Sequence, residues 1–316
     1  MAYEERIPWI QNTPVGIRIR NIALVPAHMH ENIVEIFFCL QGSVKFSYGF
    51  EEFILSPGEF VSVDKDAHYL SEGSEDNICV SFYFDLKWFR VKYPFITNLL
   101  FVCEGVKKNT KPYFTDSYKQ MKGTLIALLH YFVNHENRGN GFQEAIVKEA
   151  DQVIDMMVNY FDIVYFYNPD LSMKPELMER NRRMMGYLQE HSEEKITLET
   201  MAQDFNLSKA YISEFLRTFE VGFRKSLSYI RANKSERLLL ATDLNITEIS
   251  EACGFSDPKY YYNAFEEWYK CTPRQFRKMY RSKMNEKDSE RDMDPGGIRE
   301  PLNGMILNHY LELFLA

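Results

Sequence analysis

The sequence lacks the features of several broad protein classes. It has five cysteines in 316 residues, and none forms a CxxC pair, so a small disulfide-bonded scaffold is excluded. Its apolar runs, such as residues 33–40, are far shorter than the roughly 20 residues of a membrane-spanning helix. The first residues carry acids beside one early base and no apolar core. We therefore expect no secretory signal, no membrane association, and a cytoplasmic protein with reduced thiols.

Motifs of common catalytic classes are also missing. There is no GxSxG nucleophile elbow, no GxxxxGK[ST] phosphate loop and no Cys/His pattern with the spacing of zinc ligands. Each of these chemistries needs its residues at a fixed spacing, so their absence removes the sequence evidence for them. We expect a protein that is not an enzyme and that carries no cofactor.

Charge is distributed unevenly along the chain. The whole sequence has 37 Lys and Arg against 45 Asp and Glu, a net charge of −8, which argues against a general nucleic-acid coat. Residues 178–283 hold 18 basic and 15 acidic residues and are therefore at +3, whereas the rest of the chain is at −11. This difference predicts two chemically distinct parts.

The first part is rich in short runs typical of strands. Gly42, Gly49 and Pro57-Gly58 separate the runs VGIRIRNIALV, IVEIFFCLQG, KFSYGF, EEFILS, EFVSV and ICVSFYFD. Strand-length runs at this spacing predict an antiparallel sandwich or small barrel. Apolar residues then recur at helical spacing, which predicts two amphipathic helices over 116–136 and 142–161.

The second part contains two patterns of paired short helices. In the first, one helix stops at Asn206-Leu207 and Ser208 is placed to cap the next. Inward positions of that second helix are Tyr211, Ile212, Phe215 and Leu216. About fifty residues later Gly254 supplies the turn, Ser256 or Asp257 caps, and Pro258 occupies the first helical turn. A helix over 223–242 bridges both units, so their second helices can lie one duplex turn, ~34 Å, apart.

Residues 178–283 resemble the DNA-binding domain of the AraC/XylS family of transcription regulators. The resemblance is carried by ITEISEACGF at 246–255, Ser256-Asp257, Tyr260-Tyr261, Phe265, Thr272-Pro273, Phe276-Arg277 and the helical residues 231–240. It implies a regulator that contacts two successive major-groove segments of double-stranded promoter DNA. RNA polymerase is a further partner that the resemblance suggests.

The sequence departs from the family pattern at several charged positions. Acids stand at Glu214, Glu266 and Glu267 where bases are common, and Lys270 stands where glycine is usual. Acids near phosphates repel them, so we expect weak nonspecific binding with a shallow salt dependence. The residues expected to contact DNA are Ser208, Lys209, Ser213, Arg217, Lys259, Tyr262 and Asn263.

A cluster of potential ligands lies in the β-rich part. His28 and His30 are two residues apart and share one face of an extended strand. Glu35 and His68 can converge with them across a sheet. Three imidazoles and a carboxylate can hold a metal ion, but they can also exchange hydrogen bonds with the hydroxyls of a polyol.

Residues 15–85 also resemble the cupin fold, through His28-Met-His30, Glu35, Gly42, Ser56-Pro57-Gly58-Glu59 and His68. Sensor domains of AraC/XylS regulators are usually cupins that bind an effector. The resemblance therefore favours an effector pocket of His28, His30, Glu35 and His68 over a functional metal site made of the same residues.

Further candidates for the effector pocket are aromatic or basic. Trp9 and Arg18 are the main ones, with Arg20, Tyr48 and Trp88 beside them. An aromatic face next to polar groups suits a sugar ring, and we expect a sugar as the effector. Arg18 and Arg20 share a strand face and can hold a carboxylate, so an acidic effector remains an alternative.

Together these observations predict an α+β protein of two domains: a cupin-like antiparallel β-barrel with two following helices, then an all-α domain with two helix-turn-helix units. The predicted segments are an effector-sensing domain (1–110), helices for homodimerisation (111–165), a linker (166–177), the DNA-binding domain (178–283) and a charged, flexible tail (284–316). The expected function is a ligand-responsive regulator, an activator of carbohydrate-utilisation genes. The alternatives are a metal-dependent cupin enzyme with an appended DNA-binding domain, and a DNA-binding protein that responds to no ligand.

Overall fold

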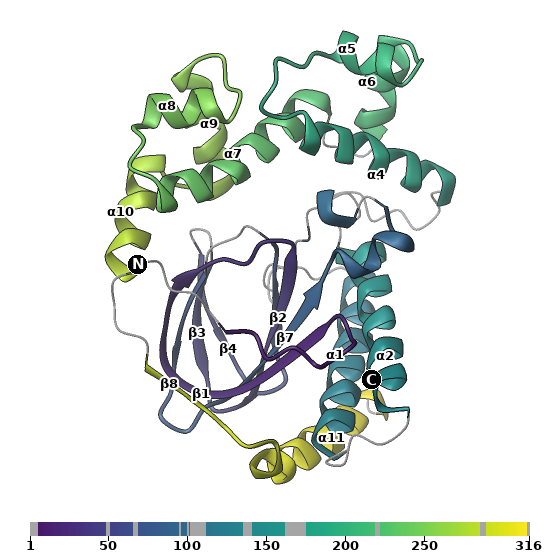
Figure 1. The fold of residues 1–316 in the computed structure, drawn as a ribbon, viewed down its shortest axis with the longest axis vertical. Coiled ribbons are helices and arrows are strands. Elements are labelled where there is room, and N and C mark those ends of the chain that lie inside the picture. Colours follow the sequence, from purple (N-terminus) through teal and green to yellow (C-terminus); the bar gives the residue numbers. More distant parts are fainter. Residues whose placement is uncertain are drawn as a thin grey trace.

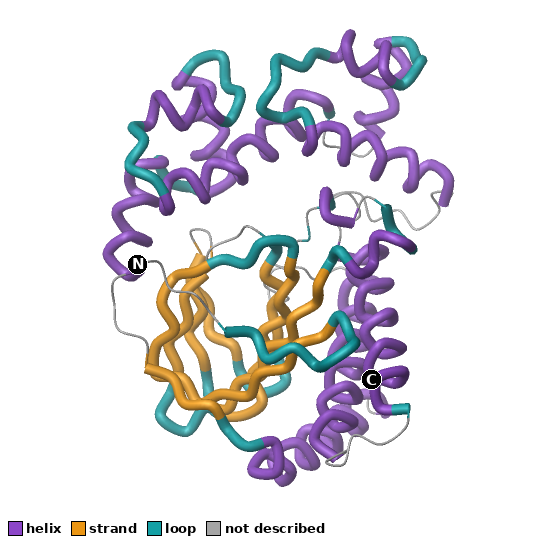
Figure 2. Tube along the Cα trace, viewed as in Figure 1, coloured by secondary structure: helices purple, strands orange, loops and turns teal. Residues whose placement is uncertain are grey.

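A computed structural model gives the fold of the chain (Figure 1). The residues that it describes are 6–48, 51–65, 69–94, 96–99, 101, 112–134, 141–161, 175–218, 222–284 and 289–314. Strands gather in the N-terminal half, and a separate group of helices lies beside them (Figure 2). The prediction of a two-domain α+β protein with an N-terminal antiparallel barrel is confirmed. Among the described helices, none is both long and apolar enough to cross a membrane.

The barrel is built from seven antiparallel strands of the N-terminal half. These are β1 (Val15–His28), β2 (Ile33–Gln41), β3 (Val44–Tyr48), β4 (Glu51–Leu55), β5 (Phe60–Val63), β6 (Tyr69–Gly73) and β7 (Ile78–Asp85). The long strand β1 pairs with β7 along its first half and with β6 along its second half. The hydrogen-bonded order is β4-β3-β6-β1-β7-β2-β5, so β1 joins the two halves of the barrel wall.

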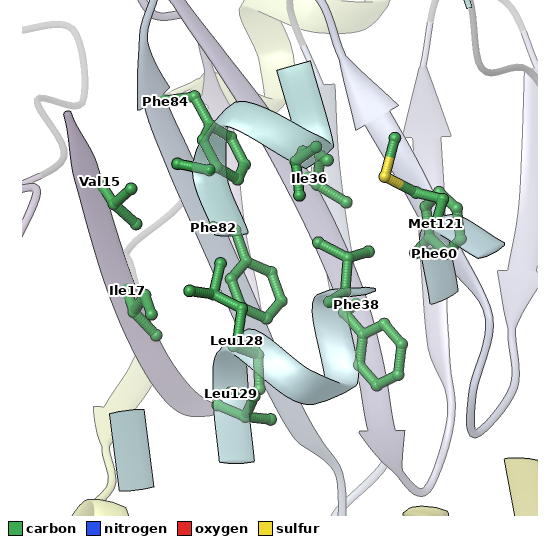
Figure 3. Close-up of a cluster of buried hydrophobic side chains, with 14 of the residues drawn as sticks. Val15, Ile17, Ile36, Phe38, Phe60, Phe82, Phe84, Met121, Leu128 and Leu129 are labelled. Carbon is green, nitrogen blue, oxygen red and sulfur yellow. The ribbon is translucent and has the colours of Figure 1, made fainter. Parts of the chain in front are cut away.

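The strands alternate between two apolar cores, as a half-buried pleated sheet requires. One core fills the barrel and is made of residues such as Phe37, Phe46 and Val61. The other lies on the outer face of β1, β2 and β7, where Ile17, Phe38 and Phe82 meet the helices (Figure 3). Charged groups of β1 and β2 that point inward are therefore enclosed by the first core.

Helices cover that outer face. They are α1 (Pro112–Asn134), α2 (Phe142–Met156) with a π-helical turn η4 (Met157–Phe161), and the C-terminal helix α11 (Arg299–Phe314). Met121, Leu128 and Leu129 of α1 contact the sheet (Figure 3). The apolar stripes of α1 and α2 are thus buried within this chain. Short 3-10 turns, η1 (Trp88–Val91), η2 (Ile96–Asn98) and η5 (Pro295–Ile298), complete this half.

The helical module contains seven helices among the described residues. They are α4 (Pro175–Glu190), α5 (Leu198–Asp204), α6 (Lys209–Thr218), α7 (Phe223–Ala241), α8 (Ile246–Ala252), α9 (Pro258–Tyr269) and α10 (Pro273–Met284). Helix α7 contributes Ile230 to one apolar core with α4–α6 and Leu239 to another with α8–α10. The predicted bridging helix therefore holds two compact units together.

The prediction of a flexible C-terminal tail was wrong for residues 289–314. Strand β8 (Ser289–Asp292) pairs with β1, and Ile298, Leu302 and Met305 are buried in the outer core. The sequence indicated that the acids of this segment are solvated. In the fold, Glu290 and Asp292 of β8 pair with arginines of β1. Arg20 pairs with Cys79 of β7 and with Asp292 of β8, so β8 lies on the opposite edge of β1 from β7.

The two halves also touch at two places. Helix α10 packs against β1, where Leu24 joins the apolar core of α7–α10. At the other end, Arg182 of α4 donates a hydrogen bond of 2.7 Å to the carbonyl of Val158 in η4. Both contacts connect the barrel side of the molecule to the helical module.

Candidate DNA-binding surface and barrel site

The first helix-turn-helix unit consists of α5 and α6. Thr197 caps α5 in a reciprocal capping box with Thr200, and the Ser208 hydroxyl accepts a hydrogen bond of 3.1 Å from the Tyr211 amide. Asn206 lies in the left-handed region at the turn, with φ 52°. These local bonds fix the start of α6 and the angle at which it leaves α5.

 

The second unit consists of α8 and α9. Asn245 and Glu248 form a capping box at the start of α8, and Asp257 caps α9 by accepting from the Lys259 amide at 2.7 Å. Pro258 occupies the first turn of α9, where no amide donor is needed. Gly254 has φ +82°, and a Cβ atom there would lie 2.5 Å from the Ser192 carbonyl oxygen. The predicted turn residue and cap are therefore present, with Asp257 rather than Ser256 as the cap.

Polar side chains tie α9 to α7 inside the second unit. The buried Tyr261 hydroxyl donates to Ser235 Oγ at 3.0 Å, and the Tyr269 hydroxyl donates to Glu236. Burial raises the pKa of Tyr261 far above its usual value. Because buried polar groups must keep their partners, these bonds fix α9 on the bridging helix.

The expected DNA contacts of the first unit are exposed on α6. Lys209 and Arg217 have exposed side chains, and each pairs with an acid: Lys209 with Glu199 at 3.3 Å and Arg217 with Glu214 at 3.2 Å. Ser213 is half-buried. Exposed pairs of this kind contribute little free energy, so a phosphate can replace either acid at small cost.

One inward position of α6 was predicted wrongly. Tyr211 is 37% exposed, stacks on Phe215 and is hydrogen-bonded to Arg180. An aromatic ring with a polar tip can lie at the edge of a core and keep its hydroxyl near a partner. Helical spacing alone does not separate this edge position from a fully inward one.

The expected contacts of the second unit lie on α9. Lys259 and Asn263 are exposed, whereas Tyr262 is half-buried against the core of its unit. Tyr260 is 60% exposed beside Lys259 and extends the exposed surface at the start of the helix. The sequence signal for Tyr260 was its position two residues after the N-terminal Pro258, on the outward side of the helix.

The barrel brings three of the predicted effector residues together. One ligand atom from each of His28, His30 and Glu35 lies within 4.8 Å of the others. Glu35 accepts a hydrogen bond of 2.6 Å from the Tyr69 hydroxyl and lies 3.3 Å from His30 Nε2. His28 Nδ1 lies 2.8 Å from the Pro26 carbonyl. His68, the fourth predicted member, lies outside the described residues.

Arginine 20 is the central charged group of the barrel interior. Its side chain is fully buried, donates to Ser81 Oγ at 2.5 Å and lies 3.7 Å from Glu35 Oε1. Arg20 and Arg18 share a face of β1, as predicted, and both pair with Glu290 of β8. Sequence reasoning gave no signal for Glu290.

The remaining predicted effector residues lie at varied places. Trp9 forms an isolated bridge with Gly16 and is 43% exposed, and Trp88 in η1 is 49% exposed. Arg18 is engaged by both Glu290 and Asp292. The side chain of Tyr48 lies outside the described residues.

The donor set fits a hydroxylated ligand better than a metal ion. His28, His30 and Glu35 supply three possible metal ligands, but the Arg20 guanidinium and the Tyr69 hydroxyl already engage the carboxylate. A guanidinium beside a metal-binding carboxylate repels the cation and competes for its negative charge. The same neighbours assist a ligand that offers both donors and acceptors.

Two family models match the chain. A helix-turn-helix domain model matches residues 201–279, which span both units, and a cupin domain model matches residues 23–81 of the barrel. These matches confirm the predicted resemblance to regulators of the AraC/XylS type. The chain therefore combines a cupin domain with a helix-turn-helix domain that serves transcription regulation through DNA.

Several known proteins are similar to this chain. An uncharacterized regulator of Bacillus subtilis, YdeC, is 24% identical over 288 residues, which cover 81% of this chain and 87% of that protein. The regulator YijO of Escherichia coli is 33% identical over 102 residues, 32% of this chain and 36% of that protein. The chain thus spans about a third of YijO. The crystal structure of ToxT from Vibrio cholerae is 15% identical, with a TM-score of 0.41 over 84% of this chain and 98% of that chain.

The names of these relatives bear on the enzyme alternative. YdeC and YijO are described as transcriptional regulators and RhaS of Enterobacter, 30% identical over 31% of this chain and 36% of that protein, as a transcriptional activator. These names support a transcription regulator, and none of the three describes an enzyme.

Proposed function

We propose that the protein is a ligand-responsive regulator that binds a repeated promoter site and activates carbohydrate-utilisation genes. The observation that carries the proposal is the pair of capped helix-turn-helix units built on one helix, α7. The second helix of each unit, α6 or α9, is the one that would enter the major groove and is called its reading helix. Two reading helices held on α7 suit two successive major-groove segments of one duplex. The barrel then serves as the sensor.

The first unit carries the stronger DNA contact in this proposal. Lys209 and Arg217 lie near the two ends of the exposed side of α6, and each pairs with an exposed acid. Ser208 starts the helix, and Ser213 lies between the two bases. On α9, Lys259 and Asn263 offer one charge and one amide, with Tyr262 half-buried beside them, so the second contact is narrower and depends on hydrogen bonds to base edges.

The effector in this proposal is a sugar or a sugar derivative bound inside the barrel. Glu35 offers carboxylate acceptors and contacts the Tyr69 hydroxyl and His30 Nε2. The ring of His28, with its own nitrogens, lies against the rings of His30 and Tyr69. Sugar hydroxyls donate and accept at once, so a mixed set of this kind suits them. Trp9, Arg18 and His68 are the further candidates for this pocket.

The proposal includes a cytoplasmic homodimer. Helices α1 and α2 bury their apolar stripes against the barrel and each other, so a second copy would pack on their outer, more polar surfaces or on the exposed side of α11. RNA polymerase is the further protein partner that activation requires.

The experiment that tests the proposal is a fluorescence anisotropy titration of the full-length protein. Duplexes from the regions upstream of its own and neighbouring genes are compared with random DNA, with and without a panel of monosaccharides and sugar acids. Specific binding that one compound alters supports a ligand-responsive regulator. Specific binding that no compound alters favours the ligand-independent alternative, and no preference over random DNA contradicts the proposal.

Three single substitutions test whether α6 and α9 contact the DNA. Arg217→Ala and Lys259→Ala should weaken binding, whereas Lys148→Ala, which removes an exposed base of α2, should leave it unchanged. Equal effects of all three substitutions would mean that overall charge, rather than α6 and α9, determines the affinity.

A further inference from the structure

Strand β8 places a carboxylate of the C-terminal tail in the wall of the barrel. Glu290 Oε2 accepts a hydrogen bond of 2.8 Å from Arg20 Nη1, and its Oε1 lies 2.5 Å from Arg18 Nη2. The Glu290 side chain is 5% exposed, whereas that of Asp292 on the same strand is 67% exposed. Two guanidinium groups therefore hold Glu290 in the way that they would hold the carboxylate of a ligand.

Arg20 connects Glu290 to the cluster around Glu35. Its second nitrogen, Nη2, donates to Ser81 and lies 3.7 Å from Glu35 Oε1. Glu35 in turn contacts Tyr69 and His30. The tail carboxylate and the groups suited to hydroxyls thus belong to one continuous polar network inside the barrel.

We propose that Glu290 occupies the carboxylate subsite of the effector, that the effector is a sugar acid, and that its binding displaces β8. The inference rests on the proposed regulator function and narrows its effector class. The carboxylate of the ligand replaces that of Glu290 on Arg18 and Arg20, and its hydroxyls contact Glu35, His30 and Tyr69. A neutral sugar that displaced Glu290 would supply no carboxylate in its place. The buried guanidinium of Arg20 would then have one anionic partner fewer, which is costly.

Displacement of β8 can affect the DNA-binding domain in two ways: through the peptide segment that connects β8 to α10, and through the packing of β1 against the helices. Helix α10 ends at Met284 and β8 begins at Ser289, so five peptide steps, at most roughly 18 Å, join them. Ser289 pairs with Leu24, the residue of β1 that packs into the core of α7–α10. The effector thereby shifts the equilibrium between a docked and a released tail, and with it the position available to α10.

The test compares the full-length protein with the variants Glu290→Gln and Asp292→Asn. Isothermal titration calorimetry measures binding of D-glucuronate, D-galacturonate, D-gluconate and, as the neutral probe, D-glucose. Glu290→Gln removes the carboxylate that competes with the ligand for Arg18 and Arg20. The affinity for at least one sugar acid should therefore rise about tenfold or more, because the conformation that can bind the ligand is no longer a minor one. Asp292→Asn should behave as the wild type, and glucose should bind to none of the three.

Hydrogen exchange of the wild-type protein provides a readout that does not depend on the folding of a variant. Saturation with the sugar acid should deprotect the amides of β8 and of Met293, which donates to the Ile19 carbonyl at 2.9 Å. The inference is overturned if no sugar acid binds to Glu290→Gln or to the wild type, or if binding leaves the exchange of β8 unchanged.

A DNA titration without ligand, on the same preparations, separates two kinds of failure. Specific DNA binding by a protein that binds no sugar acid overturns the carboxylate subsite alone. A protein without specific DNA binding contradicts the regulator function on which the inference rests.

Discussion

The carboxylate of Glu290 accepts a hydrogen bond of 2.8 Å from the guanidinium of Arg20, a residue 270 positions earlier in the chain. Both side chains are removed from solvent, at 5% and 0% exposure. The contact joins the segment that follows the helix-turn-helix units to the interior of the barrel. Removal of either group therefore has consequences for stability and for the relation between the domains.

Replacement of Arg20 by Met should destabilise the protein by about 3 kcal/mol or more, because it leaves the carboxylates of Glu35 and Glu290 buried without their shared cation. Urea unfolding followed by circular dichroism measures the change. The control is Lys92→Met, which breaks the half-exposed pair with Asp155 and should cost less than about 1 kcal/mol. Equal losses in the two variants would contradict the central role of Arg20.

Removal of charges on α6 should change DNA affinity in opposite directions. Arg217→Ala removes a phosphate or base contact and should weaken specific binding by about 1–3 kcal/mol if Arg217 reads a base. Glu214→Gln, which releases Arg217 from an exposed pair of 3.2 Å, should strengthen nonspecific binding and steepen its salt dependence. Anisotropy titrations across salt concentrations measure both effects. Weaker nonspecific binding by Glu214→Gln would place α6 away from the duplex.

Replacement of Lys270 by Gly should stabilise the second helix-turn-helix unit. Lys270 ends α9 with φ 54°, in the left-handed region, which costs a residue with a Cβ about 1–2 kcal/mol. Glycine loses part of that gain through the greater freedom of the unfolded chain, so the net increase in the free energy of unfolding should be about 0.5–1 kcal/mol. Thermal unfolding of the variant checks it, and a lower melting temperature would show that the side chain of Lys270 matters more than its backbone.

Four buried thiols should resist alkylation in the native protein. Burial raises the pKa of Cys39, Cys253 and Cys271 to about 12, and raises that of Cys79 as well. Since the thiolate is the nucleophile, iodoacetamide at pH 8 should leave these four residues unmodified until the protein is unfolded in guanidinium. Peptide mapping by mass spectrometry distinguishes the sites. Rapid modification of Cys39 or Cys79 would indicate a barrel that opens frequently.

Much of the architecture could be predicted because local patterns determine it. The apolar period of residues 142–161 corresponds to α2 and η4, and Gly254 with Pro258 marked the turn and the start of α9. The i, i+2 spacing of His28 and His30 placed both near Glu35. These features depend on neighbours in the sequence or on one face of a strand.

The errors concern contacts between distant segments. The acids of 284–316 indicated a solvated tail, because the sequence does not show that Glu290 meets Arg20 across 270 positions. Likewise, Tyr211 has the spacing of a core residue, and only its partner Arg180 on α4 explains its place at the edge. A charge whose partner lies in another domain looks the same in the sequence as a charge in water.

The most direct test of the account is a hydroxyl-radical footprint of the full-length protein on the promoter fragment that it binds with the highest affinity. Two reading helices held on α7 predict two protected segments one helical turn, about 10 bp, apart for each bound chain. Arg217→Ala should weaken one segment and Lys259→Ala the other. A single protected segment, or protection that both substitutions weaken equally, would contradict the account of two reading helices on one support.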